Sequence, residues 1–192
     1  MKILQVGDND LYCRKFAGHD LHLYLNEIGQ NSSHLVWEKL SKDSKTKVIA
    51  DRREDREEIY NATKIIRSKY GLDSIQNPIV FDILYDPLFL RTDIVHYHLI
   101  HNHIFDISFF PLMSKLKPTV WSLHDPWALY GHCIYNYDCQ EWKDGCGNCP
   151  RLKTPFQIIY DNSALNFEIK RTIFEQIKID IIVASKWMKN KI

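Results

Sequence analysis

Four cysteines lie close together in the second half of the chain and could bind a metal ion. Their spacing is Cys-x5-Cys-x6-Cys-x2-Cys, and four deprotonated thiols are a tetrahedral ligand set for Zn²⁺. Gly145 and Gly147 would allow the tight turn that a Cys-x-x-Cys knuckle needs. One or two disulfides, or four reduced thiols packed in a loop, remain open as alternatives to zinc. The cysteines are Cys133, Cys139, Cys146 and Cys149.

A second candidate group is the run of histidines in and after residues 93–98. His96 and His98 are two residues apart, so on a strand their side chains share one face. With His101 and His103 they make four histidines in eight residues, a density that could also serve zinc. The pattern favours another interpretation, in which two of them line a polar cleft where the strand ends. His98 is the candidate for that cleft.

His124 and Asp125 follow directly after another apolar run, residues 119–123. A histidine at the end of a strand could hydrogen-bond a substrate hydroxyl or transfer a proton near neutral pH. Asp125 could fix its position. The alternative is a buried histidine whose ring nitrogens are satisfied by backbone groups.

The loop from Gly7 to Gly18 is a third candidate, because it joins a strand to a helix. A helix N-terminus presents free N–H groups and partial positive charge, which suit a phosphate. Arg14 and Lys15 lie in this loop, but the spacing Gly-x-Gly-x-x-Gly is absent. An ordinary strand–helix turn therefore remains an alternative to a phosphate-binding turn.

Apolar runs alternate with helical stripes along the chain. Residues 72–92 contain Pro78 and Pro87 and are expected to form loop and short helix. Strands alternating with helices predict an α/β, Rossmann-like three-layer domain with a mostly parallel sheet. Residues 125–155 are predicted to form an irregular cysteine-rich loop insertion within it. Strands are predicted at 3–6, 33–37, 46–50, 93–98, 119–123 and 180–184, and helices at 17–28, 59–70, 104–116 and 165–178.

Length and composition limit the classes of protein that fit. A chain of 192 residues suits one domain or one half of a two-domain protein. The net charge of +1 gives no bulk attraction to nucleic acid, and no nucleic-acid partner is expected. No signal peptide and no apolar run of ~18 residues is present, so no transmembrane segment is predicted and the default compartment is the cytoplasm.

Cysteine usage and the end of the chain add two expectations. Five cysteines are an odd number, which disfavours a pure disulfide framework and makes Cys13 the expected free thiol. Ser185 is a plausible N-cap for a last helix, and the sequence stops a few residues into that pattern. We therefore expect the parent protein to continue.

Several of these motifs together resemble a known family. The stretches are Asp93-Ile-Val-His-Tyr-His, Val120-Trp-Ser-Leu-His-Asp-Pro-Trp and Gly145-Cys-Gly-Asn-Cys-Pro. They resemble the N-terminal half of family 4 glycosyltransferases, most of all the bacterial group that builds capsular, exopolysaccharide and lipopolysaccharide sugars. The resemblance spans essentially the whole chain, and residues 93–152 are its specific part.

The resemblance implies a GT-B fold, in which two Rossmann-like domains face each other across a cleft. Residues 1–192 would be the N-terminal, acceptor-side domain, and the C-terminal domain with its Glu-x7-Glu motif would be absent. The full enzyme would transfer a sugar from a nucleotide-diphosphate sugar to a hydroxyl of a glycan or lipid-linked glycan, with retention and without a catalytic metal. A lipid-linked acceptor leaves peripheral contact with the inner face of the membrane open.

Site residues carried over from the family include one departure. His124 matches the family histidine that faces the donor sugar, and His98 would line the same cleft. The loop Gly7 to Gly18 matches the glycine-rich turn near the donor phosphates. Family members usually carry a glycine pair where this chain has Phe16-Ala17-Gly18. Arg14 or Lys15 could offset that loss.

Two other functions remain open. A non-catalytic, zinc-stabilised binding module would use the cysteine loop to recruit a partner. A Rossmann-type oxidoreductase is disfavoured by the missing dinucleotide fingerprint. If the chain is a glycosyltransferase domain, the isolated fragment is expected to be inactive because it lacks most of the donor site.

Overall fold

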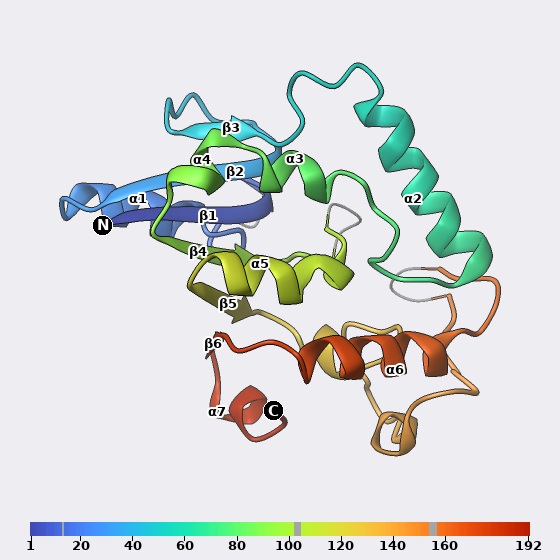
Figure 1. Cartoon of the computed structure of the whole chain (residues 1–192). Helices are drawn as coiled ribbons and strands as arrows, with labels where there is room; N and C mark the ends of the chain where they lie inside the picture. The colour runs from blue at the N-terminus through green and yellow to red at the C-terminus, as the bar shows by residue number, and fades with distance from the viewer. Residues whose placement is uncertain (13, 102–104, 154–156) are drawn as a thin grey trace.

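The computed structural model of the chain describes residues 1–192 except 13, 102–104 and 154–156. Cys13, His103 and the start of the helix predicted at 104–116 therefore lie outside the described residues. The strands form one six-stranded sheet in the order β3-β2-β1-β4-β5-β6 (Figure 1), and every neighbouring pair is parallel. The predicted parallel α/β sheet is thus confirmed. Its strands are β1 (Lys2–Asn9), β2 (Asn31–Glu38), β3 (Thr46–Val48), β4 (Ile94–His98), β5 (Thr119–Leu123) and β6 (Asp180–Val183).

Helices join the strands in the predicted order. Gly71 ends α2 in the left-handed conformation at φ 64°, and Ser185 caps α7 by accepting a hydrogen bond from the Met188 amide, as its position predicted. The segment 72–92 contains two short helices, one between Pro78 and Pro87 and one that begins at Pro87. The helices are α1 (His19–Glu27), α2 (Arg56–Tyr70), α3 (Val80–Leu84), α4 (Pro87–Arg91), α5 (Phe110–Leu116), α6 (Ser163–Phe174) and α7 (Lys186–Lys189).

Several predicted boundaries were wrong, among them the end of β3, which is Val48 and not residue 50. β1 continues past Gly7 to Asn9, because its pairing with β2 continues to Glu38. A 3-10 turn, η1 (Ile107–Phe109), capped by the Asp106 carboxylate, precedes α5, so the helix begins only at residue 110. α6 ends at residue 174, and the backbone bonds beyond it tighten to three-residue spacing instead of continuing to 178.

Two predicted helix faces were right only in part. In α2, Ile59 packs against the apolar core as predicted, but Ala62 and Tyr70 are exposed, and the buried positions are Thr63 and Arg67. In α6 and just beyond its end, Ile169, Ile173 and Ile177 meet the core as predicted, but Leu165 is 48% exposed, and Ser163, Asn166 and Lys170 are buried as well. Both helices bury long polar side chains that apolar periodicity cannot detect.

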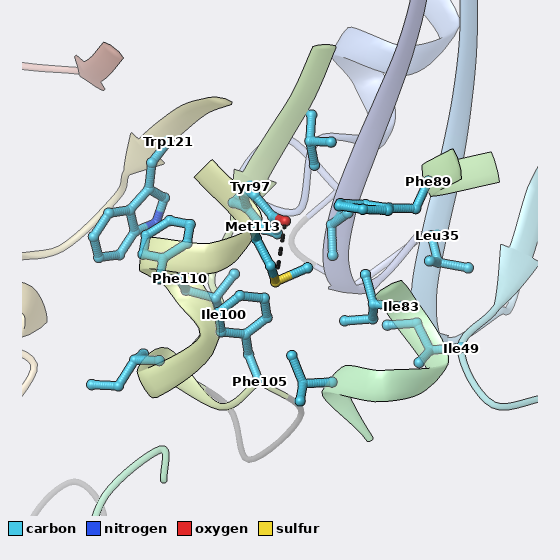
Figure 2. Close-up of a cluster of buried hydrophobic side chains, with 14 of the residues drawn as sticks. Leu35, Ile49, Ile83, Phe89, Tyr97, Ile100, Phe105, Phe110, Met113 and Trp121 are labelled. Carbon is cyan, nitrogen blue, oxygen red and sulfur yellow. Dashed lines mark hydrogen bonds between the residues drawn. The ribbon is translucent and has the colours of Figure 1, made fainter. Parts of the chain in front are cut away.

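One face of the sheet is apolar and packs against α3, α4 and α5. Phe110 lies edge-on to Tyr97 and Trp121, and the Tyr97 hydroxyl lies 3.7 Å from the Met113 sulfur (Figure 2). These buried side chains form one continuous cluster. The strands contribute to it Leu4, Val6, Leu35, Trp37, Val95, Tyr97, Trp121 and Leu123.

The alternate side chains of the same strands make the opposite face polar. They are equally buried, and apart from the apolar Ile3 and Val36 the buried strand side chains of this face are polar. α1 covers part of this face with His19, whose ring stacks on that of His34, and with His22, whose ring is tilted against it. The polar face is formed by Gln5, Ser32, His34, His96, His98 and Ser122.

The cysteine-rich insertion is irregular, as predicted, and is attached to the domain by buried aromatic rings. It contains the 3-10 turns η2 (Pro126–Leu129) and η3 (Glu141–Asp144). Trp127 is 1% exposed and belongs to the apolar cluster. Tyr130 is fully buried, donates a hydrogen bond to Asn136 and packs edge-on to Trp142.

Candidate active site

The strand order predicts where a ligand would bind. The order reverses between β1 and β4, and ligands of open parallel sheets bind beyond the carboxyl ends of the strands at such a switch point. His98 ends β4, and His124 follows β5 directly. The loop after β1, described at residues 10–12 and 14–18, lies at the same edge. The structure therefore brings together the histidine and loop candidates from the sequence.

His98 and His124 are joined in one hydrogen-bonded row with Gln5. The Nε2 atom of His98 lies 2.8 Å from Oε1 of Gln5, and its Nδ1 atom lies 3.3 Å from Nε2 of His124. His98 is 2% exposed, so it supports His124 from behind and does not itself line an open cleft. His124 is only partly buried, and the Phe16 ring meets it edge-on at 5.3 Å.

Burial lowers the pKa of both histidines. The pKa of His98 lies well below its usual value, because burial disfavours the charged ring and the neighbouring His96 and His124 oppose a second positive charge. The pKa of His124 is also lowered by burial, although the Asp125 carboxylate partly offsets this. Both rings are therefore neutral at pH 7.

Two glycines, Gly7 in β1 and Gly18 at the start of α1, let the loop between these elements lie close to the row. Gly18 has φ 84°, and a Cβ atom there would lie 2.5 Å from Nε2 of His98. A Cβ atom on Gly7 would lie 2.6 Å from the carbonyl oxygen of Ala17. Both candidate glycines thus permit close approach of the backbone to the sheet.

The two basic candidates of the loop differ in their surroundings. Arg14 forms an ion pair with Asp20 of α1 at 2.5 Å, so its guanidinium stabilises the start of the helix. Lys15 is exposed and has no hydrogen-bond or ion-pair partner in the described part of the chain. Of the two, Lys15 has the ammonium that is accessible to an anion.

Asp125 does not contact His124 by a hydrogen bond. One carboxylate oxygen accepts from the Trp127 amide at 3.0 Å and caps η2, and the other lies 2.8 Å from Nε2 of His101. The expectation that Asp125 fixes the position of His124 is therefore not met, because local capping and His101 occupy its oxygens. The residue that holds His124 is His98.

The four candidate metal ligands line one small cavity. It also includes His132, which is 1% exposed and whose two ring nitrogens have no hydrogen-bond partner in the described residues. Cys133, Cys139, Cys146 and Cys149 are all partly buried, and none of them forms a disulfide. As the described side chains stand, no three His, Cys, Asp or Glu residues are grouped to hold a metal ion, so the thiols would have to turn toward one another.

The backbone around these cysteines has features that suit thiolate ligands. Residues 145–148 all have positive φ values, which produces the tight turn between Cys146 and Cys149. The Gly131 amide donates to the Cys146 sulfur at 3.4 Å. Burial raises the pKa of Cys133 to about 11, so without a metal its thiol stays protonated and unreactive.

Sequence reasoning missed the buried ion cluster beneath the insertion. Asp73 is 2% exposed and lies 3.6 Å from Arg67 and 3.7 Å from Lys170. Lys170 donates to the backbone oxygens of Trp127 and Tyr130 at 3.2 and 2.8 Å, and Trp127 donates to Asp73 at 2.6 Å. These contacts connect α2 and α6 to the insertion. Gln5 was also missed, and its only signal was an amide in a buried-strand run.

Comparisons with known proteins give one match. No family model and no solved structure matches the chain. Over 91 residues it is 29% identical to the Escherichia coli K12 protein described as "Putative colanic acid biosynthesis glycosyl transferase WcaC", and the match covers 44% of this chain and 22% of that protein. The chain thus spans about a fifth of the length of this relative. Among the described helices, none is long and apolar enough to cross a membrane. Part of the chain is therefore similar to a glycosyltransferase of polysaccharide biosynthesis.

Proposed function

We propose that this chain is the acceptor-side domain of a glycosyltransferase that builds surface polysaccharide. The observation that carries the proposal is the place of His124: a neutral, partly exposed ring at the switch-point edge, supported from behind by buried His98. The match to a glycosyltransferase supports the same reaction class. Because that match is partial, the function of the whole protein rests on the proposal.

In this proposal a second, donor-binding domain closes over the edge, as in a GT-B enzyme. The donor is a nucleotide-diphosphate sugar, and the acceptor is a hydroxyl of a glycan or lipid-linked glycan at the cytoplasmic face of the membrane. The reaction proceeds with retention and without a catalytic metal. His124 orients a sugar hydroxyl, and Lys15 stabilises the departing diphosphate, whose negative charge grows in the transition state.

The test is turnover by the full-length protein with a panel of nucleotide-diphosphate sugars and extracted lipid-linked glycans. His124→Ala should lower turnover by about 10²–10³, the loss typical for one preorganised polar group, and should barely change thermal stability. His22→Ala is the matched control. His22 is a buried histidine held by Ser32 and Asp43 at 3.0 Å each, so its loss should lower stability and leave turnover per folded molecule unchanged.

The proposal would be abandoned if no nucleotide-diphosphate sugar supports transfer. Full turnover in His124→Ala would remove this histidine from the mechanism. A folded, inactive protein that captures a partner through the cysteine loop would instead indicate the zinc-stabilised binding module.

We also propose that the four cysteines hold a structural Zn²⁺, with buried His132 as the alternative fourth ligand. Their shared cavity and the Gly131 amide directed at the Cys146 sulfur support this. Protein purified under reducing conditions should contain about one equivalent of zinc, and Cys146→Ala should lose it while Cys13→Ala keeps it. Absence of metal together with S–S distances near ~2.05 Å would establish disulfides instead.

A further inference from the structure

The two hydrogen bonds that join Gln5, His98 and His124 run in one direction, with His124 donating to His98 and His98 donating to Gln5. The Gln5 amide is oriented with Oε1 toward His98, and in this orientation Nε2 of His98 carries the proton of the 2.8 Å bond, because an amide oxygen only accepts hydrogen bonds. His98 is neutral because burial lowers its pKa, so its Nδ1 has no proton and is an acceptor. The contact of 3.3 Å to Nε2 of His124 then requires the proton to be on His124.

The last nitrogen of the row is Nδ1 of His124, and it carries no proton. His124 is also neutral, and a ring that carries its proton on Nε2 has a free lone pair on Nδ1. In the described residues, His124 makes no hydrogen bond other than the one to His98. The lone pair on its Nδ1 is therefore not used by any hydrogen bond within the described residues.

The His98 ring is held from both sides, which keeps the row in place. The His96 ring lies 4.1 Å from it, and His96 is itself bonded to Ser122 at 2.8 Å. On the other side Gly18 approaches so closely that a Cβ atom would lie 2.5 Å from Nε2 of His98. A supporting group held this tightly can fix the orientation of the residue that meets the ligand.

We propose that Gln5 and His98 are positioning residues that hold His124 as its Nε2–H tautomer, so that Nδ1 accepts a hydrogen bond from a sugar hydroxyl. This rests on the proposed function for the nature of the ligand. The Phe16 ring, 49% exposed and edge-on to His124, adds an apolar surface against which the C–H face of a sugar ring can pack. One acceptor nitrogen beside one aromatic ring suits a sugar and not an anion.

The experiment is long-range ¹H–¹⁵N NMR on the chain labelled with ¹⁵N-histidine, at pH 7.5, since the correlation pattern distinguishes the two tautomers. His124 should be protonated on Nε2 and bare on Nδ1. Gln5→Met removes the acceptor at nearly constant length, so His98 and His124 should become tautomer mixtures. Ser122→Ala is the matched control: it removes a hydrogen bond to a histidine of the same face, that of His96, and His124 should keep its tautomer.

Several outcomes would overturn the proposal. They are an Nδ1–H tautomer of His124 in the unmodified chain, or the unmodified tautomer in a Gln5→Met protein whose amide spectrum shows it to be folded. If Gln5→Met does not fold, the unmodified chain still decides. This experiment measures no turnover. An Nδ1–H tautomer of His124 would therefore refute the positioning role of Gln5 and His98 and would leave the glycosyltransferase proposal untouched. Conversely, the expected tautomer in a full-length protein that transfers no sugar refutes only the proposed function.

Discussion

On one face of the sheet Phe110 packs edge-on against Tyr97 and Trp121, while on the other His98 bonds Gln5 and His124. Apart from His124, which is partly exposed, both sets of side chains are removed from water. The first is stabilised by contact area, which has no direction. The second is stabilised only while each donor meets an acceptor, because an unpaired buried polar group costs about 1–3 kcal/mol.

The difference shows how one sheet can combine stability with chemistry. On the apolar face the stabilisation scales with the buried area of the side chains, and neighbouring side chains can shift to restore a lost contact. These side chains therefore contribute most to the free energy of unfolding. The polar face fixes ring orientation and proton position, which are the properties a site requires. It also makes the fold sensitive to pH, since several buried rings must stay neutral.

The largest effect should come from the apolar face. Phe110→Ala removes a fully buried ring and should lower the free energy of unfolding by about 3–5 kcal/mol, measured by urea denaturation. Tyr85→Ala, at a ring that is 74% exposed, should stay within about 0.5 kcal/mol. A loss below about 1 kcal/mol for Phe110→Ala would mean that this face does not dominate stability.

Acid should weaken the polar face next. Burial lowers the pKa of His34 to about 3 and that of His96 to about 4, whereas both titrate near 6.5 when unfolded. The unfolded chain therefore binds protons first as the pH falls. The stability is present above pH 6.5 and should fall below it by about 1.4 kcal/mol per pH unit for each histidine.

His34→Gln isolates one of these protons, because an amide can still donate to the Ala17 oxygen that His34 contacts at 3.0 Å. Most carboxylates titrate below pH 4.5, so the comparison is made between pH 6.5 and 4.5. In this range the free energy of unfolding of His34→Gln should fall less steeply with pH than that of the unmodified chain. The difference in slope should correspond to about one proton fewer taken up on unfolding. Equal slopes in the two proteins would show that His34 is protonated in the folded state.

The smallest expected change is the extra loss of stability that comes from disturbing the contact between the loop and the polar face. Gly18 and Gly29 have nearly the same backbone angle, φ 84° and 81°, but only Gly18 has His98 in the way of a Cβ atom. Gly29→Ala should cost about 1–2 kcal/mol for the left-handed conformation alone. Gly18→Ala should cost at least about 1 kcal/mol more, because the His98 ring must move. Equal losses, measured by thermal unfolding, would mean that the loop does not rest on His98.

Much of the fold could be predicted because apolar periodicity reports burial directly. The run 119–123 matched β5 at both ends, since Pro118 precedes it and polar His124 follows it. The faces of α2 and α6 could not be predicted in the same way. Arg67 and Lys170 can be buried because Asp73 neutralises them, and the helical periodicity records neither Asp73, which lies beyond the end of α2, nor its pairing with Lys170, which is far away in sequence.

The candidate site divides along the same line. His124 and Gly18 could be selected from the sequence because the end of a strand and the start of a helix are local features. Gln5 could not, and neither could the attachment of Asp125 to His101 instead of His124. Each of these depends on which strands become neighbours.

The sequence by itself determined the alternation of strands and helices, the parallel sheet and the clustering of cysteines, because each follows from the types and spacing of nearby residues. Tertiary structure decided that the alternate positions of four strands form a buried polar face, and that His98 supports His124. The physical reason is that a hydrogen bond depends on distance and angle between groups brought together only by folding. Gln5 and His98 are 93 residues apart along the chain and 2.8 Å apart in the fold.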